Sequence, residues 1–385
     1  MKNIFLVIAF FYSIGFFAQI SSDSIMSKKM GESREISVFL PSSYEKNKTK
    51  RYPLLVVFDA DYLFDAFTGA LKFGNYWDDL PEVIVVGIKQ NKDGERETDC
   101  EINAKGLPTK KAIAFFDFVN TELLPSIEKK YRTANLRIVA GHDLTAGFAN
   151  LFLYQNNPAF NGYICLSPEL DQTMQERVPA QLAMFKRPVF YYQATADGDP
   201  KDVSEAIKML GENLKTIENP NLFVKTDDFL NASHYSLVLY AIPNALYHIF
   251  SAYKPITNSE YKEKIAVLEK DHVLYLIKKY DIIKRDYAID MPIRFSDFKA
   301  IEAAILKNKD YNAFDELAQL ARKNYPKSML ADYFLAQQFE NKGEDKQAMK
   351  YYLNAYQNAA IGDLTKEMMM EKVDEIKMKI PKKSK

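Results

Sequence analysis

The chain has few of the residues that hold metals or bridge distant segments, and it has no excess charge. It contains two cysteines, Cys100 and Cys165, and four histidines, and none of them falls in the short spacings that zinc ligands use. We therefore expect no metal site and no cofactor. The 51 basic and 51 acidic residues balance, which argues against a nucleic-acid partner because phosphate binding needs a basic face. Whether the two cysteines form a disulfide is left open, since a bridge needs Cα atoms within about 7 Å.

Long apolar runs are also scarce, and the one at the N-terminus stands out. Lys2 precedes an apolar stretch, residues 4–17, and Ala18 precedes a polar stretch. This layout predicts a cleaved signal peptide over residues 1–19 and export to the periplasm or the exterior. A buried first strand or a single membrane anchor is the alternative, but the run is shorter than the ~20 residues that a spanning helix needs. No later segment is long and apolar enough to span, so we expect no transmembrane segment in the mature chain.

Short apolar runs rich in β-branched and aromatic residues alternate with helical patterns. Their length and composition favour buried strands, and the alternation predicts a doubly wound, mostly parallel α/β sheet covered on both faces. An edge hairpin near residues 33–44 is expected to add antiparallel strands, and residues 109–131 read as an amphipathic helix. The expected strands are residues 52–60, 82–88, 136–142, 162–168, 188–194 and 221–226.

The pattern changes after about Tyr253, and from there helices alone are expected. Residues 298–328 and 329–359 align at a spacing of about 34 residues, the tetratricopeptide period. A plain helical hairpin is the simpler reading. Two repeats fall short of the three that a free-standing array needs, so they should pack on the first domain or on a preceding helix over residues 261–280. We expect an α/β domain over residues 20–254, a helical linker over 255–295 and a tetratricopeptide-like domain over 296–385.

The stretch RIVAGHDLTAGFAN reads as a strand, a tight turn and a helix, which is the pattern of a nucleophile elbow. Asp143 stands at the middle position, where the motif calls for serine. The backbone N–H of Leu144 would form half of an oxyanion hole, and the loop near Asp61 or Tyr62 would supply the other half. Thr145 is larger than such a turn prefers. The simpler reading is an ordinary strand-to-helix turn with aspartate as the N-cap.

A catalytic acid and a base follow in the order that this elbow requires. His234 lies in the loop NASHYSL, after the last expected strand and before an apolar helix. The acid is left open between Asp197 and Asp199 in QATADGDP, with Glu169 as a third candidate. Aspartate-glycine is also a common turn dipeptide, so local turn chemistry could explain the first two. The remaining helical histidines, His248 and His272, are expected to be structural.

Several motifs in this order resemble the "putative esterase" family, which includes esterase D and the ferric enterobactin esterases. The segments that carry the resemblance are RYPLLVVFDADYLF, IVVGIKQNKDGERETDCE, GHDLTAGFANLFLYQNNPAFNGYICLSPEL and SHYSLVLYAIPNALYHIF. The resemblance covers residues 36–252 and implies an α/β-hydrolase fold, with a tail similar to the helical extension of some secreted members. It implies that His234 is the catalytic histidine, that Asp197 or Asp199 is its acid, and that Asp61 and Tyr62 border the oxyanion loop. Arg96 matches an arginine of a loop beside the site.

The sequence departs from this family at the centre of the elbow. The family pattern is similar to G-H-S-L-G-G, whereas this chain has Asp143 for serine and Thr145 and Ala146 for the two glycines. A carboxylate there would occupy the oxyanion donors, so we expect a catalytically inactive pseudo-esterase that acts as a binding or scaffold component of the cell envelope. Its helical repeats would bind a protein partner, and its pocket a small-molecule or ester ligand. The alternative is an active hydrolase of esters, epoxides or haloalkanoates that uses Asp143 with His234.

Overall fold

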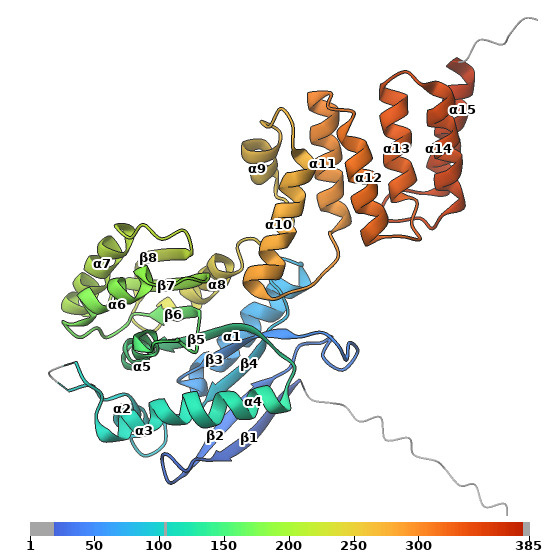
Figure 1. Ribbon diagram of the computed structural model, residues 1–385. Coiled ribbons are helices and arrows are strands. Elements are labelled where there is room, and N and C mark those ends of the chain that lie inside the picture. Colours follow the sequence, from blue (N-terminus) through green and yellow to red (C-terminus); the bar gives the residue numbers. More distant parts are fainter. Residues whose placement is uncertain (1–18, 104–105, 380–385) are drawn as a thin grey trace, which may run out of the picture.

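The computed structural model describes residues 19–103 and 106–379 and contains one eight-stranded sheet in the order β1-β2-β4-β3-β5-β6-β7-β8 (Figure 1). The first two strands form a hairpin that pairs antiparallel with β4, and the other strands run parallel. The doubly wound, mostly parallel sheet and its edge hairpin are therefore confirmed. The strands are β1 (Ile20–Met26), β2 (Ser33–Phe39), β3 (Tyr52–Val57), β4 (Ile84–Ile88), β5 (Thr133–His142), β6 (Gly162–Leu166), β7 (Val189–Gly198) and β8 (Leu222–Ser233).

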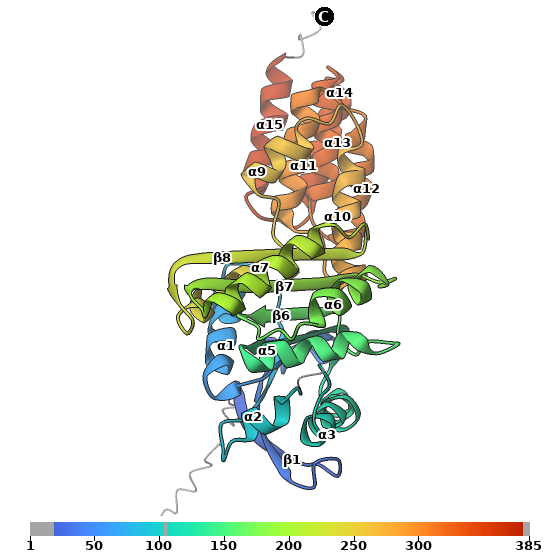
Figure 2. The same cartoon turned by 90° about the vertical axis from the view of Figure 1, so that its left-hand side faces the viewer.

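The central strands are apolar along their whole length because helices cover both faces of the sheet. Successive strand residues point to opposite faces, so Leu55 and Val57 join one core, and Leu54 and Val56 join the other. Helices α1 (Ala60–Tyr76) and α8 (Leu237–Ile249) cover the first face. The helices of the other face include α3 (Lys110–Phe118), α4 (Leu124–Lys130), α6 (Met174–Ala183) and α7 (Lys201–Lys215). Figure 2 shows α6 and α7 in front of strands β6 to β8.

The expected helix over residues 109–131 forms, but a π-helical turn interrupts it. Helix α3 passes into this turn at Val119–Leu123 and continues as α4. Proline occupies the second residue of α4, where its missing N–H cannot bond to the preceding turn. The π turn lies at this break, and the backbone stays helical from α3 through to α4. Two short elements complete this part of the chain, α2 (Glu95–Cys100) and α5 (Leu144–Ala149), the latter followed by a 3₁₀ turn (Asn150–Tyr154).

The C-terminal part is a series of helices, as expected. One prediction within it is wrong: residues 261–280 do not form a single helix. A π-helical turn covers Tyr261–Ile265 and ends at Ile265. Helix α10 begins only at His272, directly after Asp271, whose backbone is left-handed with φ of 67°. The chain turns at this point, so α9 and α10 pack as separate elements. The tail helices are α9 (Asn258–Glu260), α10 (His272–Tyr287), α11 (Phe295–Asn308), α12 (Ala313–Asn324), α13 (Leu330–Asn341), α14 (Asp345–Gln357) and α15 (Lys366–Lys379).

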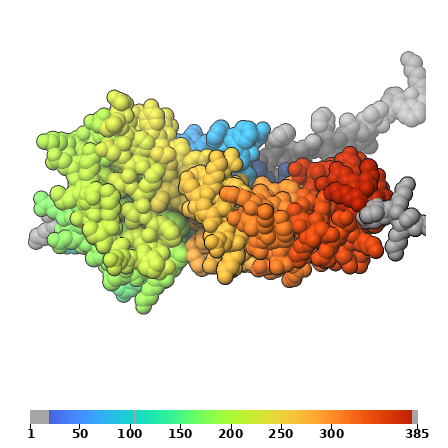
Figure 3. Space-filling model, turned by 90° about the horizontal axis from the view of Figure 1, so that it is seen from above, coloured from blue at the N-terminus to red at the C-terminus, as the bar shows by residue number. Residues whose placement is uncertain are grey.

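The helical tail shares a hydrophobic core with the sheet rather than being attached by a loose linker. The Tyr287 ring lies 5.4 Å from that of Phe250, and the core continues from helix α8 into the tail. The guanidinium of Arg294, largely buried, pairs with the carboxylate of Asp78 and stacks 4.5 Å over the Tyr253 ring. The molecule is therefore elongated, with the tail extending from one side of the sheet (Figures 1 and 3). The boundaries at residues 254 and 295 stay a prediction.

Two sequence-based expectations concern membranes and thiols. Across residues 19–103 and 106–379, none of the helices combines the length and the hydropathy that crossing a bilayer requires. The signal peptide expected over residues 1–19 falls almost wholly outside the described part of the chain. Cys100 and Cys165 are both buried free thiols in this structure.

Candidate active site

Asp143 lies at the tip of a sharp turn between β5 and α5. Its backbone has φ of 58° and ψ of −120°, a conformation that non-glycine residues adopt only when the surroundings impose it. Two close approaches impose it here. A Cβ added to Gly141 would lie 2.7 Å from the carbonyl carbon of Thr145, and one added to Gly147 would lie 2.0 Å from the carbonyl oxygen of Glu169. The turn therefore has the geometry of an elbow and not that of an ordinary N-cap.

Thr145 fits this turn, contrary to the expectation that it is too large. Its side chain is fully buried, and its hydroxyl accepts a hydrogen bond from the backbone N–H of His142 at 3.0 Å. The same hydroxyl donates to Oδ2 of Asp59 at 2.6 Å. The larger side chain is thus accommodated because the buried carboxylate of Asp59 accepts a hydrogen bond from its hydroxyl.

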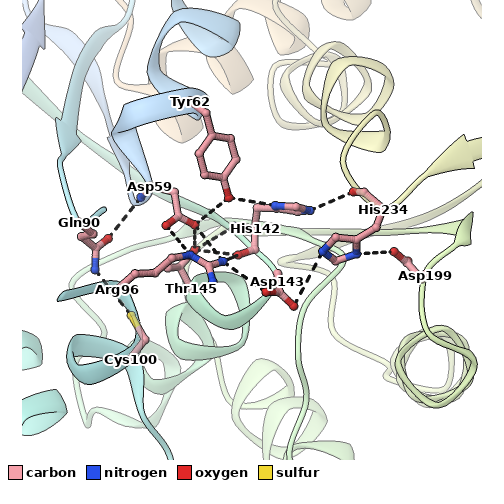
Figure 4. Close-up of polar contacts among 10 residues, drawn as sticks. All are labelled: Asp59, Tyr62, Gln90, Arg96, Cys100, His142, Asp143, Thr145, Asp199 and His234. Atoms are coloured by element: carbon pink, nitrogen blue, oxygen red, sulfur yellow. Dashed lines mark hydrogen bonds and ion pairs between the residues drawn. The ribbon is translucent and has the colours of Figure 1, made fainter. Parts of the chain in front are cut away.

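His234 and Asp199 form a close pair at the carboxyl edge of the sheet (Figure 4). Nδ1 of His234 lies 2.8 Å from Oδ1 of Asp199, whose side chain is fully buried. Oδ2 of Asp199 accepts hydrogen bonds from the Thr195 hydroxyl at 2.8 Å and from the Ala196 N–H at 2.9 Å. Burial alone would raise the pKa of Asp199, but the hydrogen bonds that it accepts hold the pKa below its ordinary value. Nε2 of His234 faces Oδ1 of Asp143 at 4.0 Å.

The two other candidate acids are not aligned with the histidine. Oδ2 of Asp197 accepts the backbone N–H of Asn231 at 2.9 Å, at the exposed end of the β7–β8 pair. Glu169 is exposed and lies near the elbow, where its N–H donates to the Asp143 carbonyl at 3.1 Å. Partial burial and the negative charge of Asp143 raise the pKa of the Glu169 carboxyl. The structure brings Asp199 to His234 and leaves Asp197 and Glu169 apart from it.

Arg96 links the elbow to a second buried carboxylate. One Nη2 of Arg96 lies 3.4 Å from Oδ2 of Asp143 and donates to the His142 carbonyl at 2.9 Å. Its Nε donates to Oδ1 of Asp59 at 2.8 Å. Burial by itself would lower the pKa of Arg96. The charge of Asp59 and the hydrogen bond to it raise the pKa by more than burial lowers it, so the guanidinium stays charged. Burial raises the pKa of the fully buried Asp59, and Arg96 only partly offsets that rise.

The loop after β3, where Asp61 and Tyr62 are predicted to border the oxyanion hole, directs its side chains to separate partners. The carboxylate of Asp61 accepts the backbone N–H of Gln90 at 3.1 Å and lines a separate polar hollow with Lys89 and Lys92. The hydroxyl of Tyr62 lies 3.1 Å from Oδ2 of Asp59 and is engaged there. Asp59, which the sequence did not single out, also reaches the elbow, through Thr145 and Arg96. The motif VVFDAD offered both aspartates, and no local signal separated them.

Two further groups complete the surroundings of the elbow. His142 is buried, and burial together with the neighbouring His234 lowers its pKa to about 4, so the ring is neutral. Because a carbonyl oxygen only accepts, the proton lies on Nε2, which donates to the His234 carbonyl at 3.1 Å. Nδ1 lies 3.0 Å from the Tyr62 hydroxyl, whose single proton faces two acceptors, this nitrogen and Oδ2 of Asp59. Leu144 is the first residue of α5, so its N–H has no partner within the helix.

No three or more histidine, cysteine, aspartate or glutamate side chains are grouped to hold a metal ion anywhere in the part of the chain that the structure describes. The polar groups at the elbow pair instead with one another and with Arg96.

The sheet order, the elbow and the acid–histidine pair define an α/β-hydrolase fold. The family model described as "Putative esterase" matches residues 27–235, more than half of the chain, and the chain belongs to that family. No curated protein matches the chain in a sequence search.

Solved structures show the same fold. The chain is similar to an uncharacterised protein from Capnocytophaga ochracea, with 27% identity and a TM-score of 0.82 over 94% of this chain and 100% of that one. Since 94% of the chain is covered, this likeness includes the helical tail. An IroE-like serine hydrolase from Shewanella oneidensis is 18% identical, with a TM-score of 0.59 over 79% of this chain and 98% of that one. The BES protein from Bacillus cereus is 20% identical, with a TM-score of 0.53 over 64% and 98%.

Proposed function

We propose that this protein is an exported, catalytically inactive member of its esterase family that binds a ligand or a partner without cleaving it. The observation that carries the proposal is the position of the Asp143 carboxylate between two cationic or polar groups. Arg96 lies 3.4 Å from one of its oxygens, and Nε2 of His234 lies 4.0 Å from the other. The carboxylate is held as a paired charge at the point where a serine esterase places a neutral hydroxyl.

Ester hydrolysis by the serine route fails with a paired carboxylate for two reasons. Attack of Asp143 on a carboxyl ester would give an anhydride, in place of the ester intermediate that serine forms. The negative charge would also lie beside the N–H of Leu144, the donor that should stabilise a substrate oxyanion. Both effects act at the reacting atoms, so the intact His234–Asp199 pair does not compensate for them.

The first test is turnover by the purified mature chain. We expect it to be silent toward aryl esters, epoxides and haloalkanoates, and to remain silent with Asp143→Asn, which keeps the size of the side chain but not its charge. Asp197→Asn provides a matched control, because its carboxylate caps an exposed backbone N–H away from the histidine. Turnover by the wild-type chain that Asp143→Asn abolishes and Asp197→Asn preserves would refute the proposal.

The alternative is an active hydrolase in which Asp143 is the nucleophile. It is favoured by the elbow backbone and by the order of the three side chains, Asp143, His234 and Asp199 (Figure 4). In that mechanism the carboxylate attacks an alkyl carbon and displaces a halide or opens an epoxide C–O bond, which leaves an alkyl ester on Asp143. A water that His234 deprotonates then attacks the ester carbonyl carbon, and the alcohol leaves with the regeneration of the carboxylate. Single-turnover reaction in ¹⁸O-labelled water would then place label in the peptide that contains Asp143. An unlabelled peptide after complete substrate consumption would exclude this route.

Export is supported by the residues before the first strand. Lys2 and the apolar stretch 4–17 precede β1, which begins at Ile20. We expect a chain expressed with its own N-terminus to be recovered outside the cytoplasm, with cleavage close to residue 19. Cell fractionation with N-terminal sequencing tests this, and an intact chain that stays in the cytoplasm would contradict it.

The binding partner is proposed from the tail. The pairs α11–α12 and α13–α14 begin at Phe295 and Leu330, a spacing close to the tetratricopeptide period, and arrays of this kind present extended surfaces to other proteins. The proposal is therefore of a protein partner at the tail and a small-molecule ligand at the elbow, with no nucleic acid. Titration of the full chain with duplex DNA in low salt should show no binding, and salt-dependent binding would contradict this part.

A further inference from the structure

Helix α2 supplies Arg96 to the elbow, yet it is too short to be stable alone. It spans Glu95–Cys100 and begins after Gly94, whose φ is 73°. Isolated helices shorter than about 12 residues are marginal in water, so tertiary contacts must hold this one. Its inner end carries Asp99 and Cys100, both fully buried. The contacts that hold Asp99 in place also determine where Arg96 lies, because Arg96 is three positions before Asp99 on the same short helix.

The anchor is Arg34, which lies in β2, the inner strand of the edge hairpin, and is 1% exposed. Its Nη1 lies 2.9 Å from Oδ2 of Asp99 and 3.0 Å from a carboxylate oxygen of Glu95. The guanidinium therefore forms ion pairs with both ends of α2. Its Nη2 lies 2.7 Å from Glu32. Nη2 also donates to Oδ1 of Asp99 at 3.2 Å, so the hydrogen bonds run through Nη2, and Nη1 contributes ion pairs alone.

A second connection runs through a carboxamide beneath the helix. Nε2 of Gln90 donates to Oδ2 of Asp99 at 3.4 Å, and its Oε1 accepts the backbone N–H of Asp59 at 3.3 Å. Asp59 in turn accepts the Nε–H of Arg96 at 2.8 Å (Figure 4). A continuous chain of buried polar contacts therefore joins Arg34 to Arg96, in addition to the backbone of α2.

The charges along this chain depend on one another. Asp99 is fully buried, and burial raises its pKa to about 6 although Arg34 lies beside it. Without Arg34, the buried Asp99 carboxylate would lose the cation paired with it and keep only the weaker influence of Lys111, a costly arrangement. Either helix α2 would move so that Asp99 reaches solvent, or the Asp99 carboxylate would take up a proton. Either change alters the support under Arg96.

We propose that Arg34 is a positioning residue that holds helix α2 so that Arg96 reaches Asp143. This deepens the proposed function, since it names what keeps the elbow carboxylate paired. Arg34 acts through α2 and Asp99 and does not itself touch the site. The contact between Arg96 and Asp143 thus depends in part on Arg34, a residue of the β1–β2 hairpin.

The test follows the Nε–H signal of Arg96 by ¹⁵N NMR, assigned by its loss in Arg96→Lys. In the native protein this proton is bonded to buried Asp59 and should exchange slowly with solvent. Arg34→Met is expected to speed its exchange at least tenfold, and Arg34→Lys, which keeps the charge, to restore part of the protection. Lys29→Met is the matched control, because its exposed pair with Asp117 lies away from α2.

An unchanged Arg96 signal in folded Arg34→Met would overturn the proposal. If that variant does not fold, Asp99→Asn gives the same readout, since it keeps the shape of the buried side chain and removes its charge. Faster exchange there supports the proposal, and unchanged exchange overturns it. The measurement needs no turnover, so an active wild-type enzyme would refute the proposed function and leave this result standing.

Discussion

The neutral state of His142 makes a quantitative prediction about stability in acid. Its pKa is about 4 in the folded protein, because burial and His234 disfavour the charged ring, against about 6.5 for an unperturbed histidine. The unfolded chain therefore binds a proton at a pH where the folded one does not. A lowered histidine pKa contributes stability that is fully present above pH 6.5 and is lost as the pH falls toward 4.

The size of the loss follows from the two pKa values. Between pH 7.5 and pH 4.5 the free energy of unfolding should fall by roughly 2–3 kcal/mol through His142 alone. His142 is 2% exposed, so solvent screening takes little from this figure. Other groups titrate over the same range, and a variant is needed to separate them.

The assay is urea unfolding of the wild type and of His142→Gln at pH 7.5 and pH 4.5. Glutamine has no titration in this range, and its carboxamide can still donate to the His234 carbonyl that Nε2 now contacts. The wild type should lose roughly 2–3 kcal/mol more than the variant between the two pH values. Equal losses in the two proteins would refute the reasoning, because they would mean that His142 is not held neutral by its surroundings.

Three further changes probe the elbow and the acid. Thr145→Val should cost about 1–3 kcal/mol in urea unfolding because it leaves buried polar partners unpaired, and Thr145→Ser should cost less. Gly147→Ala should destabilise by about 1–3 kcal/mol or more, since its Cβ would overlap a backbone oxygen at 2.0 Å, whereas Gly69→Ala in open space should be neutral or stabilising. In a variant with serine at the elbow, Asp199→Asn should lower ester hydrolysis by roughly 10³–10⁴-fold and Asp197→Asn should leave it within about twofold. Equal effects of the two aspartate variants would contradict the assignment.

The strands and the elbow were predictable because their signals are local. Buried parallel strands are continuous apolar runs, so the segment 52–60 predicted β3 and residues 136–142 predicted most of β5. The turn at Asp143 was readable from the strand, tight turn and helix of RIVAGHDLTAGFAN, and the structure adds that a Cβ at Gly141 or Gly147 would collide with backbone. The tail helices followed from their periodicity, but the break before His272 did not, because it depends on a left-handed residue at Asp271.

The choice of acid was not readable from the sequence. Asp197 and Asp199 lie two residues apart, and strand alternation places such residues on the same face. The structure separates them through a register shift in the β7–β8 pair between Ala196 and Gly198, which turns one carboxylate toward His234 and the other toward a backbone N–H. Likewise, the burial of Arg34 against Asp99 joins residues far apart in the chain, and no local pattern signals it.

The account is tested most directly by Asp143→Ser, measured for aryl-ester hydrolysis beside the wild type and beside Asp143→Ser combined with His234→Ala. The rest of the elbow and the His234–Asp199 pair are in place, so we expect the single variant to gain esterase activity over a silent wild type. The histidine substitution should remove that gain. A wild type that already hydrolyses the ester, and loses activity with serine at position 143, would contradict the claim that the aspartate has silenced this site.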